Sequence, residues 1–597
     1  MLNDNINKLL NHNLKITLLK KSNIQFIVIF WAILLICPSV MSQQWGMYTF
    51  YATQNASQAK LVDTNGTIYK TWTLASQTAY SAYLLPGDTI LQTVRYQSGN
   101  IGQGGITGKV RKINWAGTTV WEYAVSDAST QMHHDVCAMP NGNVLLICYE
   151  SKSASPTTVG SSSSITVWSE KIIEVHPTGS TTGTVVWEWH LWDHLCQSTY
   201  SNITSTYVTN VSEHPERFNV NYNLKQDWFH MNGIDYNPQL DQIVLSSHEM
   251  DEIYVIDHST TTAEAATHAG GNSGKGGDFL YRWGNPATYG LSSTGNNSGF
   301  NVIHDAHWIP STNTLYPNYL CAYNNNSSGG PGGKGNVKVA IWNPPYNSYN
   351  YTYTAGSVIG PTSVINPTIP SFTASDMGNS QQLDNGNELV CNPGGNIYEV
   401  SPDGTTLQTI SNAKSTHAYR YSMCYVRGPI ASASASATQI TSGSPVTLNA
   451  SATSITETSP SYSYSWTSNN GFTSTEQNPS VTPTANTIYT VVITNTAIGC
   501  SDTATVSVNI GTDIESNNTK HTAIAIYPNP TQGTVELSVP SSIKDYETVV
   551  MDIYGKIIFI NENQSKLDLS NLNNGIYFID VKINGRSIQR NKIILNK

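Results

Sequence analysis

Histidines recur at the ends of short strand-like runs in this sequence, where together they could transfer protons or a chemical group. The stretches that hold them read HHD at His134, FHMN at His230, SSHE at His248, IHDAH at His304 and STHAY at His417. A neutral imidazole is a nucleophile and a proton carrier near neutral pH. A single histidine of this kind usually only packs or caps, but similar placement in successive strand pairs indicates one shared site.

Other chemistries fit the sequence less well. HDAH, from His304 to His307, could give a metal two ligands. No CxxC, HExxH or complete ligand set accompanies it, so no metal site is expected. The segment from Gly330 to Gly335 satisfies GxGxxG but follows a polar run, and no GxxxxGK[ST] motif occurs. We therefore expect no nucleotide and no other cofactor.

The elements that must position the histidines follow a repeating pattern over residues 43–428. A set of several strand-like runs, separated by Pro, Asn and Gly turns, recurs about every 40–60 residues, a spacing that is typical of propeller blades. MYTFYATQ and the run after it form an incomplete blade that HAYRYSMCYV, at the far end of the region, could complete. We expect a six-bladed β-propeller; seven blades is the alternative, because two long insertions blur the repeat.

Composition and termini indicate an exported protein. Charged residues make up 12% of the 597, and the formal net charge of −10 argues against a nucleic-acid partner. Residues 1–42 are predicted to be a signal peptide, with an uncleaved membrane anchor as the alternative. Outside this segment, no membrane-spanning stretch is expected. Seven of the eight cysteines lie after this segment, so we expect at least one free thiol.

Two further modules are predicted after the propeller. Residues 429–511 begin with a low-complexity linker, PIASASASATQ, and then alternate polar and apolar residues around Trp466. This resembles an immunoglobulin-like or PKD-like β-sandwich. After a linker at 512–520, residues 521–597 carry YPNP at Tyr527–Pro530, Tyr554-Gly555 and NGIY at Asn574–Tyr577. These motifs closely resemble the C-terminal sorting domain of the type IX secretion system, a small β-sandwich that acts in export and not in chemistry. An all-β chain is therefore expected throughout.

The propeller region itself resembles the bacterial aryl-sulfate sulfotransferases. The motifs that carry the resemblance are HHDVCAMPNGNVLL, DWFHMNGIDYNPQLDQIVLSSHEMDEIYVID, YRWGNP and HDAHW. The resemblance implies transfer of a sulfuryl group from an aryl sulfate to a phenol through a covalent histidine intermediate. By motif, His304 would be the nucleophile, His134 and His248 the assisting histidines, and Arg282 the clamp for the sulfate; His133, beside His134, could take its place. His230 and His417 are expected to contact substrate.

Two functions from other classes stay open at this point. A non-catalytic propeller that binds glycans or proteins at the cell surface would keep the fold without the reaction. A quinone-dependent propeller dehydrogenase is weaker, because it would also need a calcium site that the sequence does not show. In each case the expected location is outside the cell or on the outer-membrane surface of a Gram-negative bacterium, reached by the type IX machinery.

Overall fold

The chain is all-β. The computed structural model describes residues 47–86, 89–102, 104–291, 300–325, 335–454, 460–510, 524–540, 543–552, 556–583 and 586–597. The predicted signal peptide and the 512–520 linker lie outside these residues. The chain divides into two compact units, of which the second consists of 439–444, 483–485 and 509–597.

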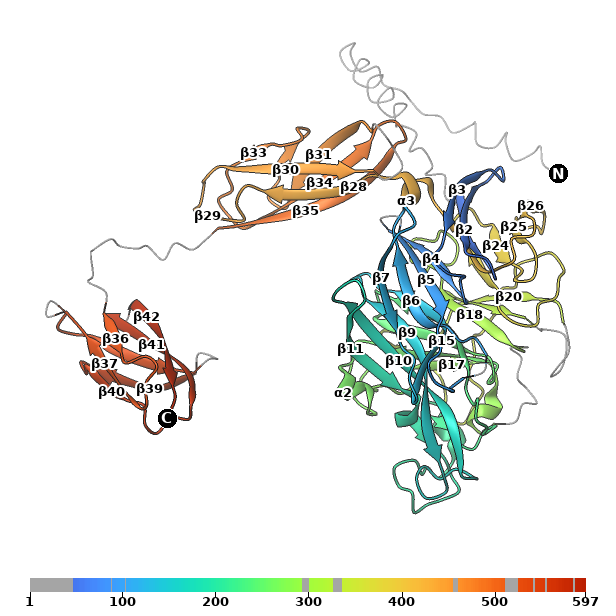
Figure 1. Ribbon diagram of the computed structural model, residues 1–597, viewed down its shortest axis with the longest axis horizontal. Coiled ribbons are helices and arrows are strands. Elements are labelled where there is room, and N and C mark those ends of the chain that lie inside the picture. The colour runs from blue at the N-terminus through green and yellow to red at the C-terminus, as the bar shows by residue number, and fades with distance from the viewer. Residues whose placement is uncertain are drawn as a thin grey trace, which may run out of the picture. The chain divides into compact units, whose positions relative to one another are not determined.

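Six antiparallel sheets follow one another through described residues 48–421 (Figure 1). The first sheet consists, in order, of β27 (Ser415–Tyr421), β1 (Tyr48–Thr53), β2 (Gln58–Asp63) and β3 (Ile68–Thr73). The second consists of β4 (Ala82–Leu85), β5 (Thr89–Arg95), β6 (Gly108–Ile113) and β7 (Thr119–Ala124). The third consists of β8 (Thr130–Ala138), β9 (Val144–Ala154), β10 (Ile165–Pro177) and β11 (Gly183–His190). The fourth is β14 (Met231–Asn237), β15 (Gln242–Ser247), β16 (Glu252–Asp257) and β17 (Tyr281–Trp283). The fifth consists of β18 (Ile303–Trp308), β19 (Leu320–Asn324) and β20 (Lys338–Trp342). The sixth consists of β23 (Asn379–Gln382), β24 (Glu388–Cys391), β25 (Ile397–Val400) and β26 (Thr406–Ile410).

Short elements connect these sheets or follow them. They are η1 (Leu191–His194), β12 (Leu195–Cys196), η2 (Val211–Glu213), β13 (Phe218–Asn219), α2 (Thr262–Ala265), η3 (Pro286–Tyr289), β21 (Tyr346–Asn347), β22 (Asn350–Tyr351) and α3 (Met423–Arg427).

Each sheet packs on the next through a shared hydrophobic cluster. The reason is visible in β9, where successive residues of the apolar run VLLI face opposite sides of the sheet. Leu145 and Ile147 pack with the fourth sheet, whereas Val144 and Leu146 pack with the second. Comparable clusters join the first sheet to the second, the fourth to the fifth and the fifth to the sixth. A further cluster joins the sixth sheet back to the first, where Leu389 packs with Tyr51 and Val62.

The expected completion of the first sheet by a strand from the far end of the region is confirmed. β27 pairs antiparallel with β1, so that Tyr48 lies opposite Tyr421. The strand is shorter than predicted, because Met423–Arg427 forms the helix α3. The Ser422 side chain accepts the Tyr425 N–H and thereby caps this helix.

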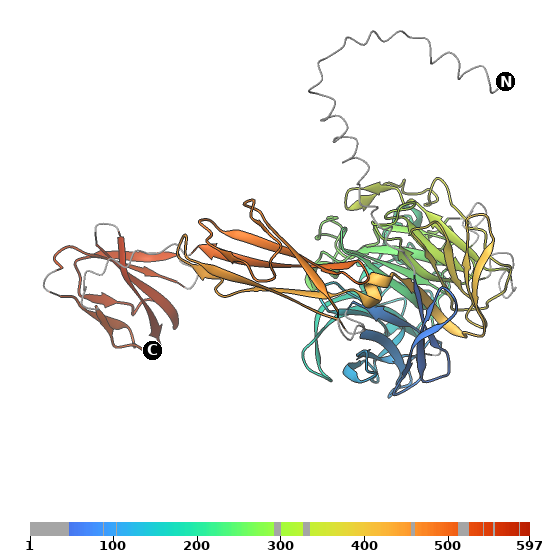
Figure 2. The same cartoon turned by 90° about the horizontal axis from the view of Figure 1, so that it is seen from above.

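After α3 the chain forms two more sheets with sandwich-like alternation, shown in orange in Figures 1 and 2. They are β28 (Ile430–Ala435), β30 (Val446–Thr453) and β33 (Ser480–Val481); and β35 (Cys500–Ile510), β34 (Thr487–Asn495), β31 (Tyr462–Ser468) and β32 (Thr473–Ser474). The expected linker at Pro429 is therefore wrong in part, because Ile430–Ala435 is a strand paired with β30. Trp466 is buried, as expected of the core aromatic. The immunoglobulin-like comparison stays a prediction.

One disulfide, Cys424–Cys500, joins α3 to β35. The sequence left this pairing open, since the two cysteines are far apart in the chain. Five cysteines stay free among the described residues, and these are Cys137, Cys148, Cys196, Cys321 and Cys391. The odd number of free thiols agrees with the expectation from the sequence.

The second unit contains the C-terminal sheets. One is β36 (Ala525–Tyr527), β37 (Thr534–Ser538) and β40 (Lys566–Asp568); the other is β39 (Ile557–Glu562), β38 (Glu547–Met551), β41 (Gly575–Ile583) and β42 (Arg586–Leu595). A cluster that includes Val535, Ile579 and Ile593 forms their common core. In the same unit, β29 (Gln439–Ile440) pairs with the last two residues of β35.

Candidate active site

The first strands of successive sheets lie beside one another, and this brings the histidines together. β14 contacts both β8 and β18, while β23 contacts both β18 and β27. His134 lies in β8, His304 in β18 and His417 in β27. His230 immediately precedes β14, and His248 immediately follows β15. Residues from different sheets thus converge, although they are far apart in sequence.

Bulges occur at comparable positions in three of the strands at this site. In β8, three residues lie between Met132 and Val136, whereas the partner strand has only one between Leu146 and Cys148. β14 and β18 show comparable shifts of register near their beginnings. The backbone angle φ is positive at His134 (47°), His230 (56°) and Asp305 (51°). Bulges bend a strand and redirect its side chains.

The aromatic rings form a continuous row. Centroid distances are 4.8 Å from His134 to His230, 5.1 Å from His230 to His248 and 5.9 Å from His248 to His304. At the other end, Tyr80 lies 5.0 Å from both His134 and His417. We call these five histidines, at 134, 230, 248, 304 and 417, the histidine row. The structure therefore brings together every histidine that the sequence assigned to the site.

His304 is held in one tautomer by two neighbours. Asn325 uses its Nδ2 to donate to the Met377 carbonyl, which leaves Oδ1 to accept from His304 Nδ1 at 2.7 Å. The Met377 N–H donates to His304 Nε2 at 3.1 Å. The ring therefore carries its proton on Nδ1 and a lone pair on Nε2. Burial, together with His248, holds the pKa of His304 well below its usual range, so the ring is neutral at pH 7.

His134 is linked to a buried carboxyl through its neighbour. His133 Nε2 lies 2.8 Å from Glu170 Oε2, and His133 Nδ1 lies 2.9 Å from His134 Nδ1. Burial raises the pKa of Glu170 well above its usual value and lowers the pKa of both histidines well below theirs. Burial therefore favours the uncharged form of each of the three groups. Of the two adjacent histidines, His134 belongs to the row and His133 supports it from behind.

The other members of the row differ in their accessibility. The His248 side chain is 28% exposed, and its Nδ1 lies 3.5 Å from Glu249, which also pairs with Lys225. His230 Nδ1 bonds with Asp227 and Tyr149. His417 is buried, and neither of its ring nitrogens has a hydrogen-bond partner among the described residues. The row thus has an open side at His248 and an unpaired polar group at His417.

Arg282 is not part of this site. It lies on β17, the fourth strand of its sheet, where it donates to both oxygens of Glu252 at 2.9 and 2.7 Å. Its remaining guanidinium donors go to the carbonyls of Pro215 and Arg217 and to the hydroxyls of Tyr254 and Thr288. The rings of Tyr254, Phe279 and Tyr289 enclose it. Because all three nitrogens are used within the protein, the predicted role as a sulfate clamp has no support in this placement.

The residues that follow the histidines line a separate cavity of about 300 Å³. Its lining includes Asp135, Asp235 and Asp305, with Tyr83 and Tyr419. Burial raises the pKa of Asp135, and raises that of Asp235 to about 6. The same cavity also holds His307, which lies 3.3 Å from Asp305. No member of the histidine row lines it, so approach to the row is better served by the open side at His248.

Sequence reasoning missed Tyr80, Glu170 and Asn325. Tyr80 precedes β4 and reaches the row from another sheet, where its hydroxyl donates to the Asn232 carbonyl. Glu170 is one of two glutamates in the long strand β10, and Asn325 opens a polar run that has the composition of a loop. No local pattern marks these three, because their roles depend on contacts between sheets.

Comparison with known proteins identifies the family of the chain. Residues 35–341, more than half of the chain, match the family Arylsulfotransferase (ASST). The chain therefore belongs to the arylsulfotransferase family, and the family supports a sulfotransferase enzyme. Residues 525–596 match the secretion system C-terminal sorting domain, which places the protein outside the cell or at the outer-membrane surface. Among the described residues no helix is both long and apolar enough to cross a membrane.

Matches to individual proteins are weak. No match was found among curated proteins. A luciferin-regenerating enzyme is 7% identical, with 62% of this chain and 87% of that one covered, at a TM-score of 0.26. The Escherichia coli adhesin FdeC is 12% identical, with 44% and 93% covered, at a TM-score of 0.12. Likenesses at this level carry no argument about fold or function.

Proposed function

We propose that the protein is a six-bladed β-propeller that transfers a sulfuryl group from an aryl sulfate to a phenol through a sulfohistidine. Support for the six blades comes from six consecutive sheets, from a hydrophobic cluster between each neighbouring pair, and from the completion of the first sheet by β27. The histidine row would then line one end of the central channel.

In the first half of the reaction, His304 Nε2 attacks sulfur. An N–S bond forms, and the bond from sulfur to the aryl oxygen breaks. His304 suits this role because its ring is neutral and its Nε2 carries the lone pair. The Met377 N–H donates to this lone pair, so that hydrogen bond has to break before the attack. This N–H would then be free to donate to a sulfuryl oxygen, whose negative charge grows during transfer.

The departing phenolate needs a proton, and His134 can supply it. At rest, Glu170 donates to His133 Nε2, and His133 Nδ1–H donates to His134 Nδ1. His134 therefore carries a proton on Nε2. When that proton leaves, each hydrogen bond can shift its own proton forward, and the negative charge ends on Glu170. In the second half the acceptor phenol attacks sulfur, the N–S bond breaks, and the phenolic proton returns along the same route.

The remaining histidines would hold substrate. His248 lies at the open side, within ring contact of both His230 and His304. It is placed to bond with a sulfate oxygen or with the incoming phenol. His230 keeps Nε2 free of partners among the described residues because only its Nδ1 is bonded. His417 has both nitrogens available.

The observation that carries this proposal is the histidine row in a chain of the arylsulfotransferase family. The test is incubation of the purified protein with a chromogenic aryl sulfate, with and without a phenolic acceptor. Acceptor-dependent release is expected. Mass spectrometry of protein quenched after donor alone should find a sulfuryl group on the peptide that contains His304. His304→Ala should lose the adduct, whereas His176→Ala, a change at an exposed histidine of β10, should keep it.

Three other outcomes would point to a different nucleophile or a different function. An adduct on His134 or His248 would move the nucleophile but leave the sulfotransferase function intact. Release by water alone would indicate a sulfatase. No release with any donor would favour a propeller that binds glycans or proteins without catalysis.

A further inference from the structure

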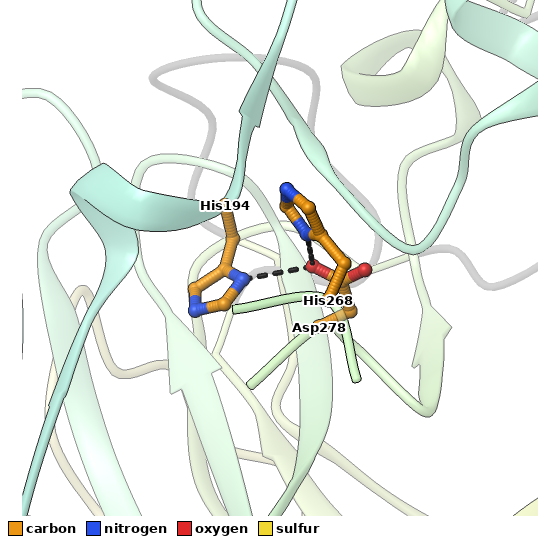
Figure 3. A group of neighbouring side chains, drawn as sticks. All are labelled: His194, His268 and Asp278. Carbon is orange, nitrogen blue, oxygen red and sulfur yellow. Dashed lines mark hydrogen bonds and ion pairs between the residues drawn. The ribbon is translucent and has the colours of Figure 1, made fainter. Parts of the chain in front are cut away.

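A second histidine cluster lies on other connections of the chain. His194 ends η1, which follows β11, whereas His268 and Asp278 belong to the segment between α2 and β17. His194 Nδ1 and His268 Nδ1 each lie 2.8 Å from the same carboxylate oxygen, Asp278 Oδ1. Figure 3 shows both contacts ending on that single oxygen. Three potential ligand atoms thus face one point.

His194 has an acceptor oxygen beside each of its two ring nitrogens. Its Nε2 lies 2.8 Å from the Ala265 carbonyl oxygen, and its Nδ1 faces the Asp278 carboxylate. A neutral imidazole has one N–H and cannot donate to two acceptors. Either the ring is doubly protonated, or a metal ion takes the place of the proton on Nδ1. In the second case Nε2–H donates to a backbone carbonyl, which is the usual outer contact of a metal-bound histidine.

The cluster also has free coordination positions. The His268 side chain is 40% exposed, so water can reach the point from its side, whereas His194 is buried. Two histidines and one carboxylate, with water completing the shell, make a common donor set for zinc.

The protein holds these ligands in place from behind. The Trp189 ring is stacked on His194, with centroids 5.5 Å apart. Gly277 allows the close approach, because a Cβ there would lie 2.6 Å from His194 Nε2. In the segment that carries His268, Thr261 and Glu264 form a capping box at the start of α2. None of these contacts involves an ion.

We propose that His194, His268 and Asp278 form a binding site for a divalent transition metal of the zinc type, which fastens the 261–278 segment to η1. Ligand atoms of a tetrahedral zinc lie roughly 3.3 Å apart for bonds of about 2.0 Å. Each 2.8 Å contact therefore has to lengthen slightly, and the exposed His268 can move to allow it. This site was not expected from the sequence, since its ligands are separated by 74 and 10 positions and match no local motif.

The test uses the full-length protein, freed of metal with a chelator and then dialysed against Zn²⁺. The wild type should retain one equivalent of zinc, and Co²⁺ in its place should give the visible absorption of a low-coordinate site. His268→Ala, at an exposed position, should bind more than about tenfold more weakly. His214→Ala is the matched control, because it removes a similarly exposed histidine beside the carboxylate of Glu216 and should bind as the wild type does.

Two results would overturn the proposal. One is zinc retention that is equal in the wild type and in His268→Ala. The other is a wild type that retains no zinc and shows both His194 ring N–H signals by NMR, which would identify a charged histidine without metal. Neither result depends on sulfotransferase activity, so the two proposals can fail separately.

Discussion

The Nδ1 atoms of His133 and His134 face each other at 2.9 Å, although the two residues are neighbours in the chain. One proton must lie between these atoms, so the tautomer of one ring fixes that of the other. Because His133 also bonds with Glu170, the state of this carboxyl decides whether His134 Nε2 carries a proton or a lone pair.

Glu170→Gln should therefore slow the transfer from poor leaving groups. The amide can still donate to His133 but cannot give up its proton, so the relay to His134 stops. We expect kcat to fall about 10- to 100-fold for aryl sulfates of weakly acidic phenols. For aryl sulfates of strongly acidic phenols, which leave without taking up a proton, kcat should change little. Glu150→Gln, in the separate Glu150–His190 pair, is the matched control. An equal loss across all donors would indicate a purely structural role.

The pH profile should extend further to the acid side than an ordinary histidine allows. The attacking ring must be neutral, and burial holds the pKa of His304 well below 6.5. Since the neutral form persists until the pH falls through that lowered pKa, the rate of adduct formation should stay level through pH 6.5 and fall only below it. Single-turnover rates with a good leaving group would measure this. A midpoint at or above pH 6.5 would show that His304 is not the group that titrates.

The stability of the protein should depend on His258. This side chain bridges Asp241 at 2.7 Å and Glu174, on the neighbouring sheet, at 3.1 Å. Burial would lower the pKa of His258, but the two carboxylates outweigh it and raise it to about 9. A raised pKa stabilises the fold fully below about pH 6.5, and this contribution disappears as the pH rises through 9.

The expected contribution is on the order of 2 kcal/mol, allowing for the partial exposure of Asp241. Urea unfolding at pH 6 and pH 9.5 would measure it. His258→Gln should lose most of the difference between the two pH values, whereas His176→Gln should keep it. Equal differences in both variants would assign the effect to other groups.

Arg282 should matter for stability more than for chemistry. Arg282→Ala leaves the buried Glu252 without a cationic partner, which costs about 3–5 kcal/mol, although the Tyr254 and Thr288 hydroxyls still donate to it. Arg282→Lys should cost less, since one donor keeps part of the pair. The folded fraction of Arg282→Lys should form the sulfohistidine at the wild-type rate. If it folds fully yet forms the adduct much more slowly, Arg282 acts on the sulfate as the family resemblance implied.

The Cys424–Cys500 disulfide predicts how many thiols react in the denatured protein. The exported protein without its signal peptide should show five reactive thiols when denatured without reductant, and seven after reduction. Peptide mapping should recover Cys424 linked to Cys500. A linkage of Cys424 or Cys500 to any other cysteine would contradict the pairing, and Cys137 is the one free cysteine that is not fully buried.

The sequence predicted much of the histidine row because its members mark strand ends. His134, His230, His248 and His304 stand where an apolar run meets a turn, and repeated sheets place such points together. The pattern could not show which face of β17 carries Arg282. That depends on Glu252, which lies on the neighbouring strand of the same sheet and takes up the guanidinium.

Contacts between segments that are far apart in the chain could not be predicted from the sequence. Glu170 reaches His133 because β10 and β8 belong to one sheet, yet nothing around Glu170 distinguishes it from a surface acid. The same holds for the cluster of His194, His268 and Asp278, whose members come from separate connections. Local composition also misled at Ile430–Ala435, where alternating Ala and Ser have the appearance of a linker but pair as a strand.

The pairing of β1 with β27 has a consequence for synthesis and export. β1 is among the first described elements of the chain to be made, but the strand that covers its edge follows more than 360 residues later. Until then β1 presents an unpaired edge that can join a neighbouring chain. The order of synthesis therefore creates an interval of exposure. A chaperone that holds the nascent chain, or a delay of folding until β27 is available, would protect it on its way out of the cell.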